Sequence, residues 1–241
     1  MAACGELATV HPPHYPSTFL NVTTSSPTSR IPLWLKLAYS AYLAVLIPVY
    51  LKYYGPTNFL FFCDVSLLLT LAGIWRESAL LISMPTVGIL LPQLFWSVDF
   101  LLQLCVGKST GLTGYMFEAD HSLLLRGLSV FHGWLPFLLI FLVARLGYDR
   151  RALPAWSLLC TVICLVAFFL LPAAGAVLAD PLTPRNVNYV YGLDDTKPQT
   201  LLPPLAYLVL WISAMISIVV IPTHFLLRKF APPVKSRLPI P

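Results

Sequence analysis

Charged side chains are scarce in this sequence. Only 10% of its 241 residues are Asp, Glu, Lys or Arg, whereas 58% are hydrophobic. A typical soluble protein carries roughly 25% charged residues. The mean hydropathy of +0.78 points the same way. Too few charged groups remain to cover a water-facing surface, which excludes an ordinary soluble domain, and we expect lipid to be the solvent for most of the chain.

Several common functional motifs are also absent from the sequence. It contains no glycine-rich phosphate loop, no HExxH zinc motif and no serine nucleophile elbow. The five cysteines form no CxxC pair, and the i, i+4 pair Cys160 and Cys164 has no His or carboxylate close in sequence. No basic stretch is interleaved with aromatics, as nucleic-acid binding would require. We therefore expect no metal, no cofactor and no nucleic-acid partner.

Apolar runs dominate what is present. A helix needs about 20 apolar residues to cross the bilayer core, and six stretches approach or exceed this length: 33–51, 59–75, 79–106, 122–143, 153–171 and 202–227. The runs are continuous, which favours an all-α bundle of six transmembrane helices over a barrel of alternating strands. Pro85 and Pro92 lie inside the third run and predict a tilted or kinked helix.

The distribution of positive charge predicts the orientation. With six spans, both termini and the second and fourth connectors share one side, which holds ten of the 15 Lys and Arg residues. The positive-inside rule then places both termini in the cytoplasm. We expect a disordered tail over 1–30, rich in Pro, Ser and Thr, a six-helix transmembrane domain over 31–229, and a short basic tail over 230–241.

Three ionisable residues lie inside the expected spans: Asp64, Asp99 and His132. A charged residue near the centre of a membrane helix costs about 2.5–3.5 kcal/mol, so each needs a reason. At about 1.5 Å of rise per residue, all three fall in the outer half of the bilayer. This convergence predicts a polar cavity that opens to the outer side. Alternatively, the two aspartates pair with Arg126 or with backbone donors to fix the bundle.

Cys63 directly precedes Asp64 and is a candidate nucleophile. A thiol needs a general base to become reactive, and His132 is the one histidine inside an expected span. A catalytic Cys/His pair is therefore possible only as Cys63 and His132. Neighbouring helix positions point about 100° apart, so we do not expect Cys63 and Asp64 to serve one site equally. The alternative is that Cys63 packs in the helix bundle as a small apolar side chain and has no chemical role.

Three segments together resemble a known family. Residues 62–68, Phe-Cys-Asp-Val-Ser-Leu-Leu, look like the Cys-Asp-hydrophobic-Ser start of the second span in the YwaF-like bacterial integral membrane proteins. Phe131-His132-Gly133 lies in the fourth span, where that family keeps its histidine. The run Asn188-Tyr189-Val190-Tyr191, followed by Lys197-Pro198 and Pro203-Pro204, is similar to its Asn-Tyr motif before the sixth helix. The order matches over residues 35–228, although the flanks of His132 and the approach to Lys197 depart from the pattern.

The resemblance implies a function. The YwaF-like proteins are related to eukaryotic transmembrane glycerophospholipid acyltransferases that use a Cys and a His, and more distantly to the androgen-induced/ADTRP hydrolases, which use Thr in place of Cys. By this likeness, Cys63 attacks a phospholipid ester and His132 serves as the base, while Asn188 and Tyr189 line the site or stabilise the oxyanion. Membrane lipids are then the substrates, and a bacterial cytoplasmic membrane is the expected location.

Two other hypotheses stay open from the sequence. One is a proton-coupled carrier of small solutes, in which Asp64, Asp99 and His132 form a relay. The absence of an internal repeat counts against it. The other is an assembly subunit without chemistry, whose protein partners the sequence does not reveal.

Overall fold

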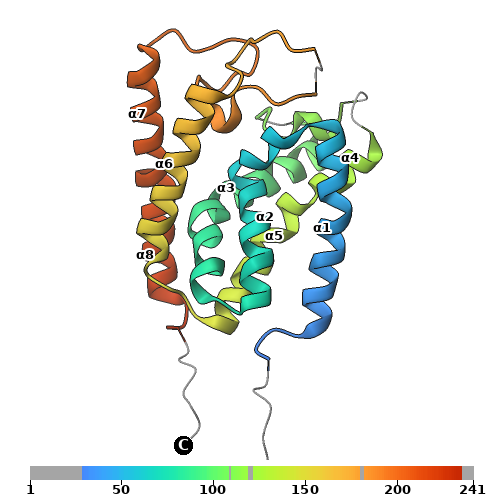
Figure 1. Cartoon of the computed structure of the whole chain (residues 1–241), viewed down its shortest axis with the longest axis vertical. Coiled ribbons are helices and arrows are strands. Elements are labelled where there is room, and N and C mark those ends of the chain that lie inside the picture. The colour runs from blue at the N-terminus through green and yellow to red at the C-terminus, as the bar shows by residue number, and fades with distance from the viewer. Residues whose placement is uncertain (1–28, 109, 119–121, 180–181, 235–241) are drawn as a thin grey trace, which may run out of the picture.

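The chain forms a helical bundle (Figure 1). This computed structural model describes residues 29–108, 110–118, 122–179 and 182–234, and across these ranges the only β-type pairing is an isolated bridge between Tyr148 and Pro233. Five of the described helical segments are long and apolar enough to cross a membrane: Leu33–Tyr53, Ala79–Val106, Leu123–Leu146, Ala152–Leu170 and Pro204–Phe230. The expectation of an all-α, multi-pass membrane protein is confirmed at this level.

The second expected span is shorter than the sequence suggested. Helix α1 (Leu33–Tyr53) ends before Gly55, whose φ of +76° suits glycine. A 3₁₀ turn, η1 (Pro56–Leu60), follows, and helix α2 (Phe62–Arg76) has only 15 residues. At 1.5 Å per residue it is about 22 Å long, against about 30 Å of hydrocarbon core. The apolar run from residue 59 thus includes a turn that hydropathy alone does not separate from the helix.

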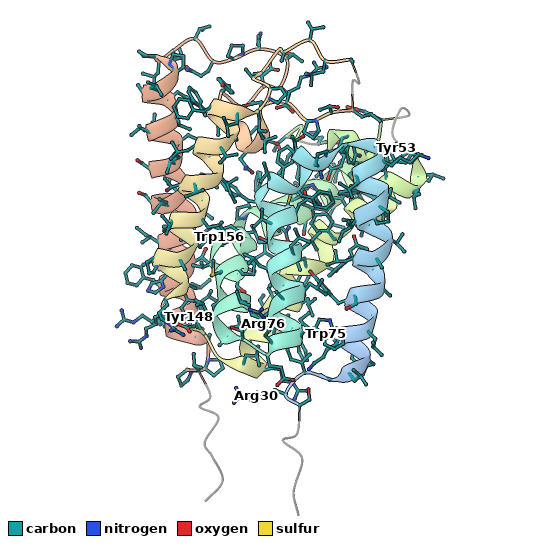
Figure 2. All side chains as sticks on the ribbon, viewed as in Figure 1. Arg30, Tyr53, Trp75, Arg76, Tyr148 and Trp156 are labelled. Atoms are coloured by element: carbon teal, nitrogen blue, oxygen red, sulfur yellow. The ribbon has the colours of Figure 1, made fainter. Side chains whose placement is uncertain are left out.

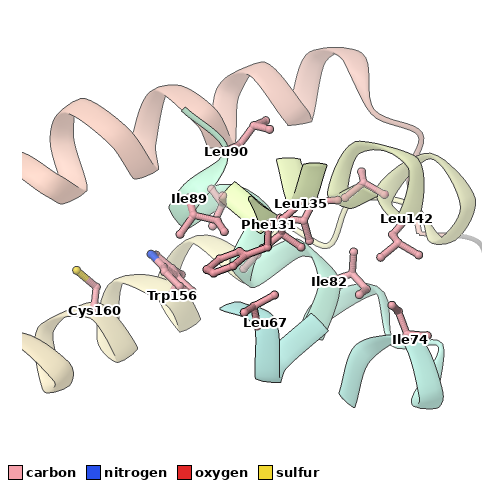
Figure 3. Close-up of a cluster of buried hydrophobic side chains, with 14 of the residues drawn as sticks. Leu67, Ile74, Ile82, Ile89, Leu90, Phe131, Leu135, Leu142, Trp156 and Cys160 are labelled. Atoms are coloured by element: carbon pink, nitrogen blue, oxygen red, sulfur yellow. The ribbon is translucent and has the colours of Figure 1, made fainter. Parts of the chain in front are cut away.

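Helix α3 (Ala79–Val106) is the centre of the bundle. It keeps the bounds predicted from the sequence, is helical through Pro85 and Pro92, and contacts α2, α5, α6 and α8. Gly88 allows close packing, because a Cβ there would lie 1.9 Å from a ring atom of Trp156. Figure 3 shows Trp156 pointing into the buried hydrophobic cluster that packs around α3.

The fourth expected span is broken in two. Helix α4 (Leu123–Ser129) and helix α5 (Phe131–Leu146) meet at Val130. The amide of Gly133 donates to the carbonyl of Val130 at 2.8 Å instead of continuing the α-helical pattern to Ser129. The break therefore frees the Ser129 carbonyl for another donor.

The last two spans match their predicted cores. Helix α6 (Ala152–Leu170) precedes the loop 182–203, and the final segment comprises α7 (Pro204–Ala214), a π-helical turn η4 (Met215–Val220) and α8 (Ile221–Phe230). Short π-helical turns are rare and occur frequently at functional sites. Figure 1 shows that α1 begins and α8 ends at the same end of the bundle, opposite the long loops.

Ion pairs gather at the end of the bundle where α1 begins. Lys36 pairs with Glu77 at 2.9 Å, and Arg151 pairs with Asp149 at 2.7 Å. Figure 2 places Arg30 and Arg76 at this same end. The tails expected over 1–30 and 230–241 lie mostly outside the described residues.

Candidate functional site

A cavity of about 490 Å³ lies toward the loop end of the bundle. Its walls come from α1, α2, α3, α5, the loop 182–203, α7 and η4, and they include Gln93, Trp96 and five residues singled out from the sequence: Cys63, Asp64, His132, Asn188 and Tyr189. The structure thus brings together five of the six predicted site residues. Asp99 is the one predicted site residue that does not line this cavity.

Cys63 lies in the first turn of α2 and is half-buried. Its thiol donates to the carboxyl oxygen Oδ2 of Asp64 across 3.5 Å. Both side chains line the cavity, although their helical spacing predicted that they would not share a site equally. The reason is that the cavity lies over the N-terminus of α2 rather than beside the helix, so the consecutive residues 61–64 all reach it.

Asp64 is almost fully buried, with 3% of its surface exposed. Its Oδ2 also accepts a hydrogen bond from Nδ2 of Asn58 at 3.3 Å. Its Oδ1 has no hydrogen-bond partner among the residues that the structure describes. Buried polar atoms are nearly always paired, so this oxygen is a candidate contact for a bound molecule.

His132 is oriented by the break between α4 and α5. Its Nδ1 lies 2.8 Å from the freed carbonyl oxygen of Ser129. Because a carbonyl can only accept, Nδ1 carries the proton, and Nε2 of the neutral ring is left as a proton acceptor. The ring stacks on Trp96, with centroids 5.1 Å apart and planes 25° apart. The imidazole is therefore held in the tautomer that leaves Nε2 free to act as a general base.

Asn188 fixes the start of α2 from the loop 182–203. Its Oδ1 accepts from the amide of Phe62 at 3.0 Å, and its Nδ2 donates to the carbonyl of Leu60 at 2.8 Å. The side chain is 4% exposed. Its backbone carbonyl accepts from Nε1 of Trp211 at 2.8 Å. The amide group of Asn188 is thus engaged in positioning the backbone next to Cys63.

Tyr189 is held in a costly backbone conformation. Its φ is +61°, in the left-handed region, which costs an ordinary L-residue about 1–2 kcal/mol. The neighbouring loop is tied down by Asn186, whose Oδ1 accepts from the Tyr191 amide at 2.8 Å and whose Nδ2 donates to the Gly192 carbonyl at 2.8 Å. Strain of this kind persists where the surroundings determine the conformation, often at functional sites.

Asp99 anchors a loop near the C-terminal end of α3. Its carboxylate accepts from the amides of Thr110 and Thr113, at 2.7 and 3.1 Å, and from the Thr113 hydroxyl at 2.8 Å. The sequence left open that the aspartates accept hydrogen bonds from backbone N–H groups, and Asp99 does so. Arg126 donates to the carbonyl of Met116 at 3.4 Å. Asp99 therefore holds the loop, and it does not line the cavity that Asp64 and His132 line.

Sequence reasoning missed Gln93 and Trp96, which lie one turn apart on α3 and line the cavity. Gln93 is 3% exposed, and neither of its side-chain polar atoms has a hydrogen-bond partner within the described part of the chain. An amide side chain in the middle of a 28-residue apolar helix is the signal that would have revealed it. Among the described residues, no group of three or more His, Cys, Asp or Glu side chains is placed to hold a metal ion.

Comparisons of the chain with protein-family models, with curated proteins and with solved structures find no match. The resemblance to the YwaF-like proteins therefore stays a prediction from three short motifs. The geometry of the cavity is the independent basis for a function.

Proposed function

We propose that this protein is a membrane-embedded acyltransferase or lipid-ester hydrolase that acts on glycerophospholipid acyl chains, with Cys63 as nucleophile and His132 as base. One observation carries the proposal. A thiol and a histidine whose Nε2 is left to accept a proton line the same largely apolar cavity. An apolar cavity with few polar groups is typical of sites for amphiphilic ligands.

The first half-reaction forms a thioester. His132 Nε2 takes the thiol proton as Sγ of Cys63 attacks the ester carbonyl, and the proton then passes to the leaving alcohol as the C–O bond breaks. The thiol donates to Asp64 in the structure, so its proton must rotate away from Asp64 before transfer. In the second half-reaction, a hydroxyl or water attacks the thioester and the thiol is restored.

Backbone amides at the start of α2 are suited to stabilise the oxyanion. The first N–H groups of a helix have no intrahelical partner. The side chain of Asn188 accepts from the N–H group of Phe62. The N–H groups of Cys63 and Asp64 have no carbonyl acceptor among the described residues. Both amides adjoin the nucleophilic sulfur. Tyr189 lines the same cavity and supplies a hydroxyl donor. Removal of one oxyanion donor typically costs about 10²–10³-fold in rate.

The proposal includes a membrane placement. Helix α2 serves as a sixth crossing, both termini face the cytoplasm, and the cavity lies in the outer half of a bacterial cytoplasmic membrane. The excess of Lys and Arg on the side of the termini supports this orientation. Ester groups of phospholipids lie at the head-group boundary, near the depth of the α2 N-terminus in this placement.

The test is phospholipid turnover by the full chain in lipid nanodiscs. Cys63→Ala and His132→Ala are each expected to lower release or transfer of a labelled acyl chain by at least about 10²-fold. Cys105→Ala is the matched control, because Cys105 is exposed and does not line the cavity. Full activity in both site variants would exclude the proposed chemistry.

A further inference from the structure

Three buried polar atoms form what we call the polar wall of the cavity: Oδ1 of Asp64, and Oε1 and Nε2 of Gln93. None has a hydrogen-bond partner within the described residues, and both side chains are 3% exposed. Both residues line the same cavity from different helices, α2 and α3. Since buried polar groups nearly always have partners, the polar wall indicates a polar group of a bound molecule.

The polar wall adjoins the proposed catalytic residues. Asp64 directly follows Cys63 and accepts a hydrogen bond from its thiol. Gln93 lies one turn before Trp96 on the same face of α3, and Trp96 stacks on His132. A group held by the polar wall therefore lies in the same cavity as the nucleophile and the base.

The chemistry of the polar wall selects hydroxyl groups. The Gln93 amide both donates and accepts, whereas the Asp64 carboxyl accepts when ionised and donates when protonated. A hydroxyl does both, so it suits Asp64 in either state. An ammonium group only donates and leaves Nε2 of Gln93 unpaired. A phosphate mainly accepts and is repelled by ionised Asp64. Two hydroxyls supply enough donors and acceptors for all three atoms.

We propose that Asp64 and Gln93 bind the hydroxyls of an uncharged polyol head group, and that the acyl acceptor is a single-chain amphiphile with such a head group. The role as acceptor rests on the proposed acyl transfer, whereas the binding does not. In the transfer step, one hydroxyl oxygen attacks the thioester carbonyl of Cys63. The new C–O bond forms, the C–S bond breaks, and the hydroxyl proton passes through His132 to the sulfur.

The test uses Cys63 as a reporter of occupancy. The wild-type chain in nanodiscs is alkylated with N-ethylmaleimide, and modification of Cys63 and Cys105 is followed by peptide mass spectrometry. Test amphiphiles are 1-O-dodecylglycerol and dodecyl glucoside, which separate a glycerol head group from a sugar. Controls are the di-O-methyl ether of dodecylglycerol, dodecyltrimethylammonium and dodecyl phosphate, each at the same concentration.

We expect at least one of the two polyol amphiphiles to slow alkylation of Cys63 about tenfold more than the three controls do, because a site built for hydroxyls rejects analogues that lack them. Alkylation of Cys105 should not change. Gln93→Met should abolish this protection, whereas Gln103→Met, the same change on the same helix outside the cavity, should retain it. Protection is expressed for each variant as the ratio of the Cys63 alkylation rates without and with the amphiphile. A change in the intrinsic reactivity of Cys63 therefore cancels.

Equal protection by the dimethyl ether, no protection by either polyol, or undiminished protection in Gln93→Met would overturn the inference. If Gln93→Met does not fold, the comparison of dodecylglycerol with its dimethyl ether in the wild type decides alone. Polyol-selective protection in a chain that forms no thioester from phospholipid would support the binding site and remove its role as acceptor site. The two proposals therefore fail separately.

Discussion

The side-chain amide of Asn188 clamps the start of helix α2: it accepts from the Phe62 amide at 3.0 Å and donates to the Leu60 carbonyl at 2.8 Å. The contact joins residues more than 120 positions apart and fixes the turn that presents Cys63. The loop after helix α6 thereby positions the helix end that carries Cys63.

Replacement of Asn188 should harm both stability and activity. Asn188→Ala leaves the Phe62 amide and the Leu60 carbonyl without partners, at about 1–3 kcal/mol per buried group. We expect lower thermal stability in nanodiscs and a loss of acyl turnover. Asn188→Asp keeps an acceptor for Phe62 but no donor for Leu60, so it should fall between wild type and Asn188→Ala. An Asn188→Ala variant with wild-type melting would contradict the clamp.

Two tyrosines of the same loop should separate activity from stability. Tyr189→Phe removes a hydroxyl that lines the cavity, so turnover should fall by about tenfold or more while the melting temperature stays unchanged. Tyr191→Phe removes a hydroxyl that donates to the Phe168 carbonyl, so it should lower the melting temperature more than the turnover. Paired melting and turnover measurements on both variants check this. A larger loss of turnover in Tyr191→Phe than in Tyr189→Phe would show that the Tyr189 hydroxyl is not the oxyanion donor.

Glu77 should give a pH-dependent contribution to stability. Burial raises the pKa of Glu77, but hydrogen bonds from Ser29, Lys36 and the amides of Arg30 and Ile31 outweigh it and lower the pKa to about 2. A lowered folded-state pKa stabilises the fold above the ordinary value of 4.5, and this contribution is lost as the pH falls towards 2.

Glu77→Gln should therefore destabilise the chain by about 1–3 kcal/mol at neutral pH, because it removes a charged partner of buried Lys36. The difference from wild type should shrink between pH 4.5 and the lowest pH at which the wild type still folds. Thermal unfolding of the wild type and Glu77→Gln in nanodiscs at several pH values measures this difference in stability. A difference that stays constant from pH 7 to pH 3 would mean that the Glu77 charge does not contribute.

Gly88 should tolerate no side chain. A Cβ at this position would lie 1.9 Å from Cε2 of the Trp156 ring. Overpacking of this kind typically costs about 1–3 kcal/mol or more, so Gly88→Ala should markedly lower the melting temperature. Gly127→Ala is the matched control, because among the described residues no atom beyond its chain neighbours and its own helix backbone lies within 4 Å of the added Cβ. Similar melting temperatures for the two variants would contradict the close approach of α3 and α6.

Much of the fold follows from hydropathy, because lipid selects long apolar helices. The bounds of α1, α3 and α6 agree with the apolar runs to within two residues. Hydropathy did not separate Phe59 and Leu60, the apolar end of the turn η1, from α2, and it did not reveal the break at Val130. Both irregularities lie at the cavity and orient side chains there.

The site was only partly predictable. Unusual residue types in apolar runs singled out Cys63, Asp64 and His132, and the structure places all three in the lining of one cavity. The positioning contacts were not predictable, because they join side chains to backbone groups. Asn188 reaches Leu60, and His132 reaches a carbonyl that only the helix break makes accessible. Such contacts depend on the tertiary packing and leave no periodic pattern in the sequence.

The most direct test of the account is the intact mass of the purified chain after incubation with a phospholipid of two defined acyl chains, wild type beside Cys63→Ala. We expect the wild type to gain the mass of one acyl group, hydroxylamine to remove it, and Cys63→Ala to show no gain. An acyl adduct that persists in Cys63→Ala, or wild-type turnover matched by Cys63→Ala without any adduct, would contradict a Cys63 thioester.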